Sequence, residues 1–223
     1  MIDFENLDPA RVCEALAPLI ADDRRDRIDE VLATRLGGLV LVLENLHDPH
    51  NGAAALRSCE AAGLQTVHAV EGIEPFRFSA KVTQGCERWL EIHRHKTTDA
   101  AVTALRNEGF RLAAAVPGAL ATLADFQWSQ PYALWIGNEH EGLTPAARAA
   151  CDVEFSLPMS GMTRSLNLSV ASALAVFEAA TRRRAAIGQP GDLDPEEQAR
   201  LRARWYIEDV RGADAVLRRV GII

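Results

Sequence analysis

The sequence of 223 residues lacks the patterns that mark several protein classes. Its four cysteines form no C-x-x-C pair, which argues against a zinc site and indicates reduced thiols. No apolar run reaches the roughly 18 residues that cross a bilayer, and the N-terminal segment carries acids where a signal peptide needs positive charge. We therefore predict a soluble, cytoplasmic protein that does not enter membranes.

Several familiar site motifs are missing as well. The sequence has no G-x-G-x-x-G after a strand, no G-x-x-x-x-G-K-[ST] and no G-x-S-x-G, which argues against a dinucleotide-binding site, a P-loop and an α/β-hydrolase. His47, Asp48 and His50 match no zinc spacing, so we predict no bound metal. His93 and His95 alternate along an expected strand, which favours a pair on the surface.

Lysine is scarce, because 22 of the 24 basic residues are arginine. The net charge of -7 argues at first against a nucleic-acid partner. Residues 178–223 nevertheless hold nine Arg against eight acids, and they include three consecutive arginines at positions 182–184. Arginine pairs with phosphate through two hydrogen bonds. A solvated helix face explains such a segment as well as an RNA contact does.

Strand-like and helix-like segments alternate along the chain. The apolar run 39–43 is typical of a buried parallel strand, and further strands are expected at 66–70, 89–95, 110–116, 132–137 and 153–158. Helices are expected at 52–63, at 99–108, after the N-cap Thr144 and at 167–187. This alternation predicts an α/β fold with a mostly parallel sheet flanked by helices.

The two ends of the chain read differently from the middle. Residues 8–35 predict two short helices with the charged stretch 22–27 between them, and 188–198 resembles a linker before a C-terminal helical piece. We therefore expect an N-terminal helical extension (1–37), a central α/β domain (38–187) and a C-terminal helical extension (188–223).

Three strand-end loops, 44–57, 137–145 and 157–169, are polar and rich in small residues. Ligands bind outside the carboxyl ends of parallel strands. The sequences NGAAALR (51–57), IGNEHEGL (136–143) and LPMSGMTRSLNLSVASA (157–173), in this order, resemble the three motifs of the SpoU-type RNA ribose 2′-O-methyltransferases. The segments RRDRIDEVLATR (24–35) and QGCERWLEIH (84–93) are similar to the branch that methylates guanosine 18 in the D-loop of tRNA.

The resemblance implies a fold with a C-terminal trefoil knot and S-adenosylmethionine as the cofactor. It implies that the cofactor lies among residues of three loops: Ala115, Val116, Gly118, Ile136, Gly137, Asn138, Leu157, Met159 and Leu166. It also implies an active site made of five residues: Asn51, Arg57, Glu139, Ser165 and Asn167. From the residues alone, Asn51 is equally a helix N-cap and Glu139 equally a capping carboxylate.

Arg57 is the residue on which we expect catalysis to depend most. A guanidinium is a poor base, so Arg57 either acts in an environment that disfavours its charge or positions a phosphate while another group takes the proton. Ordinary packing at strand ends is the competing interpretation for the cofactor residues, and a helix-surface arginine is the one for Arg57.

The resemblance further implies a tRNA substrate and a homodimer with the long helix 167–187 at its interface. We expect tRNA contacts from arginines in both extensions and in the long helix: Arg24, Arg25, Arg35, Arg182, Arg200 and Arg204. Trp205 and Tyr206 either stack on bases or, as we favour, pack a short helix onto the body or onto a partner subunit. Two alternatives stay open: a related enzyme for ribosomal RNA or another tRNA position, and a non-catalytic knotted RNA-binding protein.

Overall fold

The computed structural model describes residues 7–72 and 75–223, which form two compact units. We call residues 36–189 the body, and residues 1–35 together with 190–223 the helical unit. Within the described residues, no helix is long and apolar enough to cross a membrane.

The body is built on a six-stranded parallel sheet with the strand order β3-β2-β1-β5-β4-β6. The strands are β1 (Leu39–Glu44), β2 (Thr66–Val70), β3 (Glu91–His95), β4 (Arg111–Ala115), β5 (Tyr132–Ile136) and β6 (Val153–Phe155). All residues of the central strands β1 and β5 are buried, as their continuous apolar runs predict. The predicted α/β fold with a parallel sheet is therefore confirmed.

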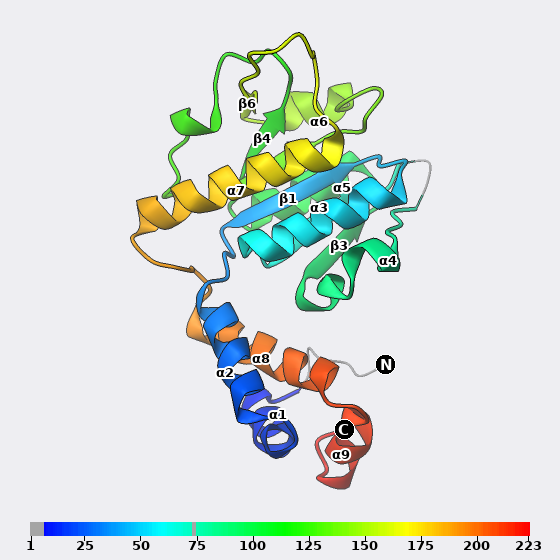
Figure 1. Ribbon diagram of the computed structural model, residues 1–223, viewed down its shortest axis with the longest axis vertical. Coiled ribbons are helices and arrows are strands. Elements are labelled where there is room, and N and C mark those ends of the chain that lie inside the picture. Colours follow the sequence, from blue (N-terminus) through cyan, green and yellow to red (C-terminus); the bar gives the residue numbers. More distant parts are fainter. Residues whose placement is uncertain (1–6, 73–74) are drawn as a thin grey trace. The chain divides into compact units, whose positions relative to one another are not determined.

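Helices cover both faces of the sheet (Figure 1). On one face α3 (Pro49–Ala62) and α7 (Leu168–Ile187) lie against Leu39, Leu41 and Leu43 of β1. On the other face α5 (Thr98–Asn107) and α6 (Pro145–Ala150) cover Val40 and Val42. The side chains of one strand thus alternate between two separate cores. The short α4 (Ala80–Thr83) and the 3₁₀ turns Cys86–Trp89 (η3) and Leu123–Asp125 (η4) complete the body.

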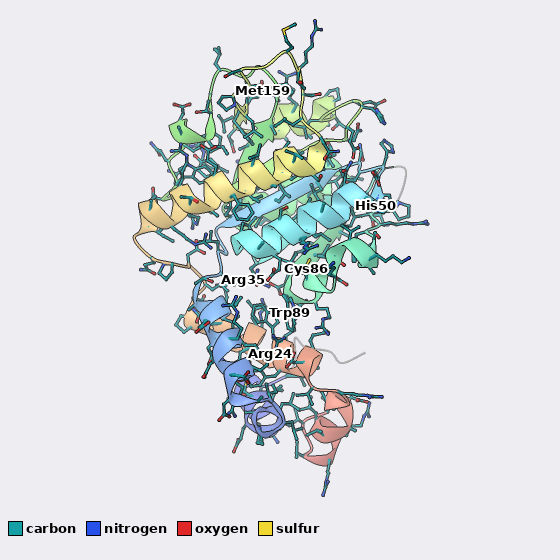
Figure 2. The ribbon with its side chains drawn as sticks, in the orientation of Figure 1. Arg24, Arg35, His50, Cys86, Trp89 and Met159 are labelled. Carbon is teal, nitrogen blue, oxygen red and sulfur yellow. The ribbon has the colours of Figure 1, made fainter. Side chains whose placement is uncertain are left out.

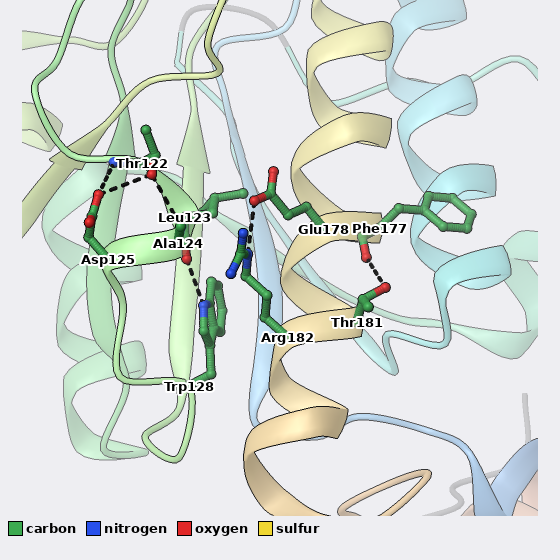
Figure 3. A network of polar contacts seen from close by, with 9 residues as sticks. All are labelled: Thr122, Leu123, Ala124, Asp125, Trp128, Phe177, Glu178, Thr181 and Arg182. Atoms are coloured by element: carbon green, nitrogen blue, oxygen red, sulfur yellow. Dashed lines mark hydrogen bonds and ion pairs between the residues drawn. The ribbon is translucent and has the colours of Figure 1, made fainter.

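The segment between β4 and β5 is held by a local network (Figure 3). The carboxylate of Asp125 accepts hydrogen bonds from the backbone N–H of Thr122 at 2.8 Å and from its hydroxyl at 3.0 Å. The indole of Trp128 donates to the carbonyl oxygen of Leu123 at 2.8 Å. These bonds fix Trp128 where its ring packs 5.3 Å from Tyr132 of β5, at the end of the core next to α7.

The helical unit consists of α1 (Pro9–Leu16), the 3₁₀ turn Ala17–Leu19 (η2), α2 (Asp22–Ala33), α8 (Pro195–Asp209) and α9 (Ala213–Arg219). Its two halves, far apart in the sequence, are joined by ion pairs of Arg24 with Asp209 (2.7 Å) and of Arg202 with Asp29 (2.6 Å). Trp205 and Tyr206 are buried, as packing rather than base stacking predicts, but Trp205 lies against Arg35 of the helical unit itself.

Two of the boundaries that differ from the sequence prediction have a clear local cause. Residues 22–27 are not a connection but the first turns of α2, where Asp22 and Asp23 lie favourably at the positive end of the helix dipole. The third strand begins at Glu91 rather than at Trp89, because Cys86–Trp89 forms a 3₁₀ turn.

His93 and His95 are not a simple surface pair, because they surround a buried third histidine. The imidazole of His68 on β2 is 1% exposed, and its Nδ1 lies 2.9 Å from Nε2 of His95. Its ring also stacks on His93, with centroids 5.0 Å apart. Burial, with the charges of His93 and His95, lowers the pKa of His68 from 6.5 to about 3.

We expect this cluster to make the protein sensitive to acid. Between about pH 6.5 and 3 the unfolded chain holds a proton at His68 that the folded chain does not. The stability is therefore complete above pH 6.5 and falls with decreasing pH, by at most about 1.4 kcal/mol per pH unit from this residue. Urea unfolding at pH 5 and pH 8 should show a smaller pH effect in His68→Asn than in the unaltered protein or in the exposed control His47→Asn. Equal pH effects in all three would contradict this expectation.

Candidate active site

The functional loops gather at the carboxyl edge of the sheet, between β1 and β5. The chain order reverses at this point, because β2 and β3 lie on one side of β1 while β5, β4 and β6 lie on the other. Such a reversal leaves a crevice outside the strand ends. The loop after β1 leads into α3, which carries Asn51, and the loop after β5 carries Glu139.

Three of the predicted active-site residues meet through hydrogen bonds. The side-chain amide of Asn51 donates to the carboxylate of Glu139, and its oxygen accepts a hydrogen bond from the amide of Asn167 at 3.2 Å. These residues are 88 and 116 positions apart from Asn51 in sequence. The structure therefore joins the loops after β1, β5 and β6 at one polar cluster, which we call the Asn51 cluster (Asn51, Glu139 and Asn167).

Helix capping accounts for only one residue of the Asn51 cluster. Asn167 caps α7, since its oxygen accepts from the backbone N–H of Ser169 at 2.9 Å. Asn51 is not an N-cap, because α3 begins at Pro49 and Asp48 caps it. Glu139 is not a cap either, because the hydroxyl of Thr144 caps α6. The side chains of Asn51 and Glu139 therefore have a role other than helix N-capping.

Arg57 and Ser165 lie outside the hydrogen-bonded cluster. Arg57 is exposed on α3, six residues after Asn51 and so about 9 Å further along the helix axis. Burial raises the pKa of the Cys86 thiol to about 11, and the nearby charge of Arg57 partly offsets that effect, which places Arg57 toward η3. Ser165 is exposed two residues before Asn167. Within the described chain, no hydrogen bond fixes either side chain.

The predicted cofactor residues lie on three adjacent loops. Because β5, β4 and β6 are neighbours in a parallel sheet, residues 136–138, 115–118 and 157–166 follow strand ends at one edge. Met159 (Figure 2) and Leu166 are apolar, yet they expose 39% and 37% of their surface. Exposed apolar side chains beside open backbone suit the flat adenine ring of a bound cofactor.

Asn138 and Gly137 shape their loop rather than simply lining it. The Asn138 oxygen accepts from the backbone N–H groups of His140 (2.9 Å) and Glu141 (2.7 Å). A side chain at Gly137 would stand 2.1 Å from the backbone carbon of Gly142, so this position admits only glycine. Both residues therefore fix the tight turn that presents Glu139.

The predicted RNA-contact arginines differ in their availability. Arg35 is fully buried, with its guanidinium carbon 5.1 Å from the centre of the Trp205 ring, which argues against the contact that we predicted for it. Arg24 is ion-paired with Asp209, and Arg25 with Asp22. Arg200 is exposed on α8, and Arg204 is partly buried there.

The run of three arginines in α7 has a structural role. Arg182 pairs with Glu178 one turn earlier at 2.9 Å (Figure 3). Arg183 is buried and donates to the carbonyl oxygens of Trp128 (3.1 Å) and Gln130 (2.9 Å), and Arg184 donates to that of Ala62 (2.9 Å). Two of the three consecutive arginines therefore fasten α7 to the rest of the body.

Glu44 is a residue of the site that the sequence analysis missed. It ends β1 and is fully buried, and its carboxylate accepts from the hydroxyls of Thr98 (2.8 Å) and Thr144 (2.9 Å) and from the Thr144 backbone N–H (2.9 Å). Thr144 closes the loop that carries Glu139. The only sequence signal was an acid directly after the apolar run LVLVL.

We expect Glu44→Gln to lower the free energy of unfolding by about 1–3 kcal/mol. The new amide turns donors toward groups that already donate to Glu44, so at least one buried hydrogen bond is lost. Urea unfolding measures the effect. The control is Glu141→Gln, the same chemical change at an exposed position of the loop that Thr144 closes. A Glu44→Gln protein as stable as the control would show that these three bonds contribute little.

Among the described residues, no three His, Cys, Asp or Glu side chains are grouped in a way that could hold a metal ion. The site instead contains the amides of Asn51 and Asn167, the carboxylate of Glu139 and, further along α3, the exposed guanidinium of Arg57. Such groups position a polar substrate and a cofactor by hydrogen bonds.

Comparison with known proteins agrees with this geometry. Residues 38–177 match the model of the SpoU rRNA Methylase family. The tRNA (guanosine(18)-2′-O)-methyltransferase of Thermus thermophilus is 35% identical over 187 residues, which are 82% of this chain and 95% of the relative.

Solved structures show the same likeness. The TrmH/SpoU tRNA modifying enzyme of A. aeolicus matches with a TM-score of 0.75 at 28% identity, over 85% of this chain and 98% of that one. The SpoU methyltransferase AviRb from Streptomyces viridochromogenes, in complex with the cofactor AdoMet, matches with a TM-score of 0.60 at 28% identity, over 72% of this chain and 64% of that one. The predicted trefoil knot is consistent with this fold.

Proposed function

Because the chain belongs to the SpoU rRNA Methylase family, we propose that it methylates the ribose 2′-hydroxyl of guanosine 18 in the D-loop of tRNA, with S-adenosylmethionine as the methyl donor. The observation that carries the proposal is the Asn51 cluster, in which three separate loops meet by hydrogen bonds at the carboxyl edge of the sheet. The relative from Thermus thermophilus has this activity in its name.

The chain's contribution to the reaction is mainly positioning. S-adenosylmethionine supplies a methyl group already activated by a positive sulfur, so holding the 2′-oxygen in line with that methyl provides much of the rate. The loops after β4, β5 and β6 hold the cofactor through the nine residues that we predicted from the motifs. The Asn51 cluster fixes the relative positions of these loops and orients the ribose.

Arg57 and Ser165 complete the site from its rim. Both side chains are exposed, so they are accessible to a large substrate such as tRNA. Arg57 binds the phosphate next to the target ribose and brings the 2′-hydroxyl to the methyl group. A guanidinium has five donors and no acceptor, which suits an anion better than it suits proton abstraction.

The helical unit supplies further contacts with tRNA. Arg200 and Arg204 on α8 and Arg25 on α2 belong to surfaces that are partly or fully exposed. Contacts of this kind position the substrate and weaken with salt. A tRNA substrate also agrees with the cytoplasmic location predicted from the sequence.

A homodimer is the second part of the proposal. One face of α7 is apolar and exposed: Val170, Leu174 and Phe177 show 47%, 51% and 49% of their surface. Residues spaced by three and four positions form one stripe of a helix. An open groove of about 790 Å³ runs along this stripe beside Leu157 and Pro158. Asn167, a member of the Asn51 cluster, is the N-cap of α7. A second copy that packs on the stripe therefore lies directly beside the active site.

The test is methylation of a single nucleotide. Unmodified tRNA transcript and radiolabelled S-adenosylmethionine should give one methyl group, on the ribose of guanosine 18. The same tRNA with dG18 lacks only the acceptor hydroxyl and should stay unlabelled. Label that persists in the dG18 tRNA, or that enters only ribosomal RNA, would assign a different target. Calorimetry without any binding of S-adenosylmethionine would favour a non-catalytic RNA-binding protein.

A further inference from the structure

A positively charged segment borders the active site in a chain that is otherwise acidic. Residues 75–96 hold five Lys or Arg and two Glu, a balance of +3, whereas the whole chain carries -7. The chain's two lysines, Lys81 and Lys96, both lie in this segment. None of these charged residues belongs to the three motifs at 51–57, 136–143 and 157–173.

The segment packs directly against the start of α3, where Asn51 lies. The backbone N–H of Ser79 donates to the carbonyl oxygen of Pro49 at 3.3 Å. A side chain at Gly52 would stand 3.3 Å from the Phe76 ring and 3.4 Å from the Arg77 carbonyl oxygen. The backbone at Arg77 is therefore one packing layer away from the helix turn that holds Asn51.

The buried carboxylate of Glu71 holds this segment in place. Glu71 is 5% exposed, and it accepts from the backbone N–H of Phe76 at 3.1 Å and from Lys96 at 2.6 Å. Arg94 bridges Glu71 (3.3 Å) and the carbonyl oxygen of Phe76 (2.9 Å). These bonds lower the pKa of Glu71, with the Lys96 bond as the largest cause. Glu71 therefore stays ionised and holds the backbone at Phe76, directly before Arg77 and close in sequence to Lys81.

The cations of the segment thus divide into two groups. Arg94 and Lys96 are engaged by Glu71. Arg77 and Lys81 are exposed, and neither forms an ion pair within residues 7–72 and 75–223. Arg148 on α6 is also exposed, but it is paired with the carboxylate of Glu154. Two positive charges without an ion pair among the described residues therefore stand beside the active site, on a backbone that Glu71 holds by hydrogen bonds.

Further along, the segment reaches the amino edge of the sheet, where it carries an aromatic side chain. On η3, which follows α4, the guanidinium of Arg88 lies 4.9 Å from the centre of the Trp89 ring, and Trp89 is partly exposed. Figure 2 marks His50 on the first turn of α3, and Cys86 and Trp89 on η3. Arg57 on α3 lies near enough to Cys86 for its charge to lower the pKa of that thiol against the effect of burial. Cations interspersed with an exposed aromatic ring suit a polyanion that carries flat bases.

We propose that Arg77 and Lys81 bind the sugar–phosphate backbone of the substrate RNA next to the target ribose. The inference rests on the proposed function only in taking RNA as the substrate. The surface adds affinity and register on the body itself, independently of the arginines of the helical unit. Since each phosphate contact releases counterions, it contributes a defined part of the salt dependence of binding.

The test compares single-charge variants in their salt dependence. We expect Lys81→Ala and Arg77→Ala each to reduce the slope of log K for unmodified tRNA against log salt by about 1. Their KM for tRNA should rise, with kcat and the calorimetric Kd for S-adenosylmethionine unchanged. Lys81→Arg should keep the original slope. The control Arg148→Ala removes the same charge from α6, on the other face of the sheet, and should leave the slope unchanged.

A second measurement needs no substitution. With two lysines in the chain, Lys81 and Lys96, acylation of amines followed by mass spectrometry of the separated peptides measures Lys81 independently of Lys96. Saturating tRNA should protect Lys81, and Lys81 acylated at the same rate with and without tRNA would overturn the proposal. So would Lys81→Ala and Arg77→Ala proteins with the slope of the Arg148→Ala control.

The outcomes separate the two proposals. Slopes that fall as expected in a protein that methylates no tRNA would leave the surface standing and remove the proposed reaction. Guanosine 18 methylation with unchanged slopes and unchanged KM in both variants would leave the reaction standing and remove the surface.

Discussion

Arg57→Ala is expected to lower kcat for methylation of tRNA by about 10²–10⁴-fold, the range found for loss of a group that handles the reacting proton or places it. The side chain is exposed and no hydrogen bond of the described chain depends on it, so its loss does not disturb the fold. Binding of S-adenosylmethionine, which we propose to take place at the loops after β4, β5 and β6, should persist. Single-turnover methylation and calorimetry measure the two effects separately.

A conservative variant distinguishes the two roles open to Arg57. Lysine keeps the charge but not the planar pair of donors. If Arg57 binds a phosphate through two hydrogen bonds, Arg57→Lys should recover only part of the rate, whereas a purely electrostatic role predicts nearly full recovery. A rate for Arg57→Ala equal to that of the unaltered protein would remove Arg57 from the mechanism.

The fold could be predicted from the sequence wherever local signals agree with the tertiary structure. The apolar run 39–43 became β1, and Thr144 caps the helix that it was expected to cap. Gly63 ends α3 as predicted. Each of these rests on a few adjacent residues, for which burial in a parallel sheet or helix capping leaves one favourable conformation.

Predictions were wrong where a distant residue decides the environment. Arg35 has the sequence context of a surface arginine, yet it is buried beside Trp205, which lies 170 positions later in the numbering. His93 and His95 alternate as a surface pair would, yet they enclose His68 of the neighbouring strand. In both cases the partner comes from another part of the chain, which periodicity does not reveal.

The motif residues show the same division. Their presence was recognisable, but the bonds of Asn51 were not, because capping was an equally good local explanation. Only the strand order, which brings the ends of β1 and β5 together, places Glu139 and Asn167 against Asn51. Glu44 was missed because its role depends on hydrogen bonds from Thr98 and Thr144, which lie at the starts of α5 and α6.

Phe177→Asp is expected to convert the proposed homodimer into monomers and to abolish most methylation. Phe177 is the last residue of the exposed stripe of α7 and lies between Leu174 and Thr181 in the lining of the groove. A carboxylate buried there without a partner costs about 3–5 kcal/mol, which raises the dimer Kd by a factor of more than about 100. Analytical ultracentrifugation at micromolar protein should then detect a species of about half the original mass.

The loss of activity would follow from the position of the stripe, not from unfolding. Asn167 is the N-cap of α7 and a member of the Asn51 cluster. Release of the second copy therefore frees the helix turn that holds Asn167. The matched control is Ala186→Asp, which adds the same charge to an exposed position of α7 outside the groove. It should stay dimeric and active, and far-ultraviolet circular dichroism should be the same for both variants. A Phe177→Asp protein that keeps its mass, or an unaltered protein that is already monomeric, would show that α7 is not the interface.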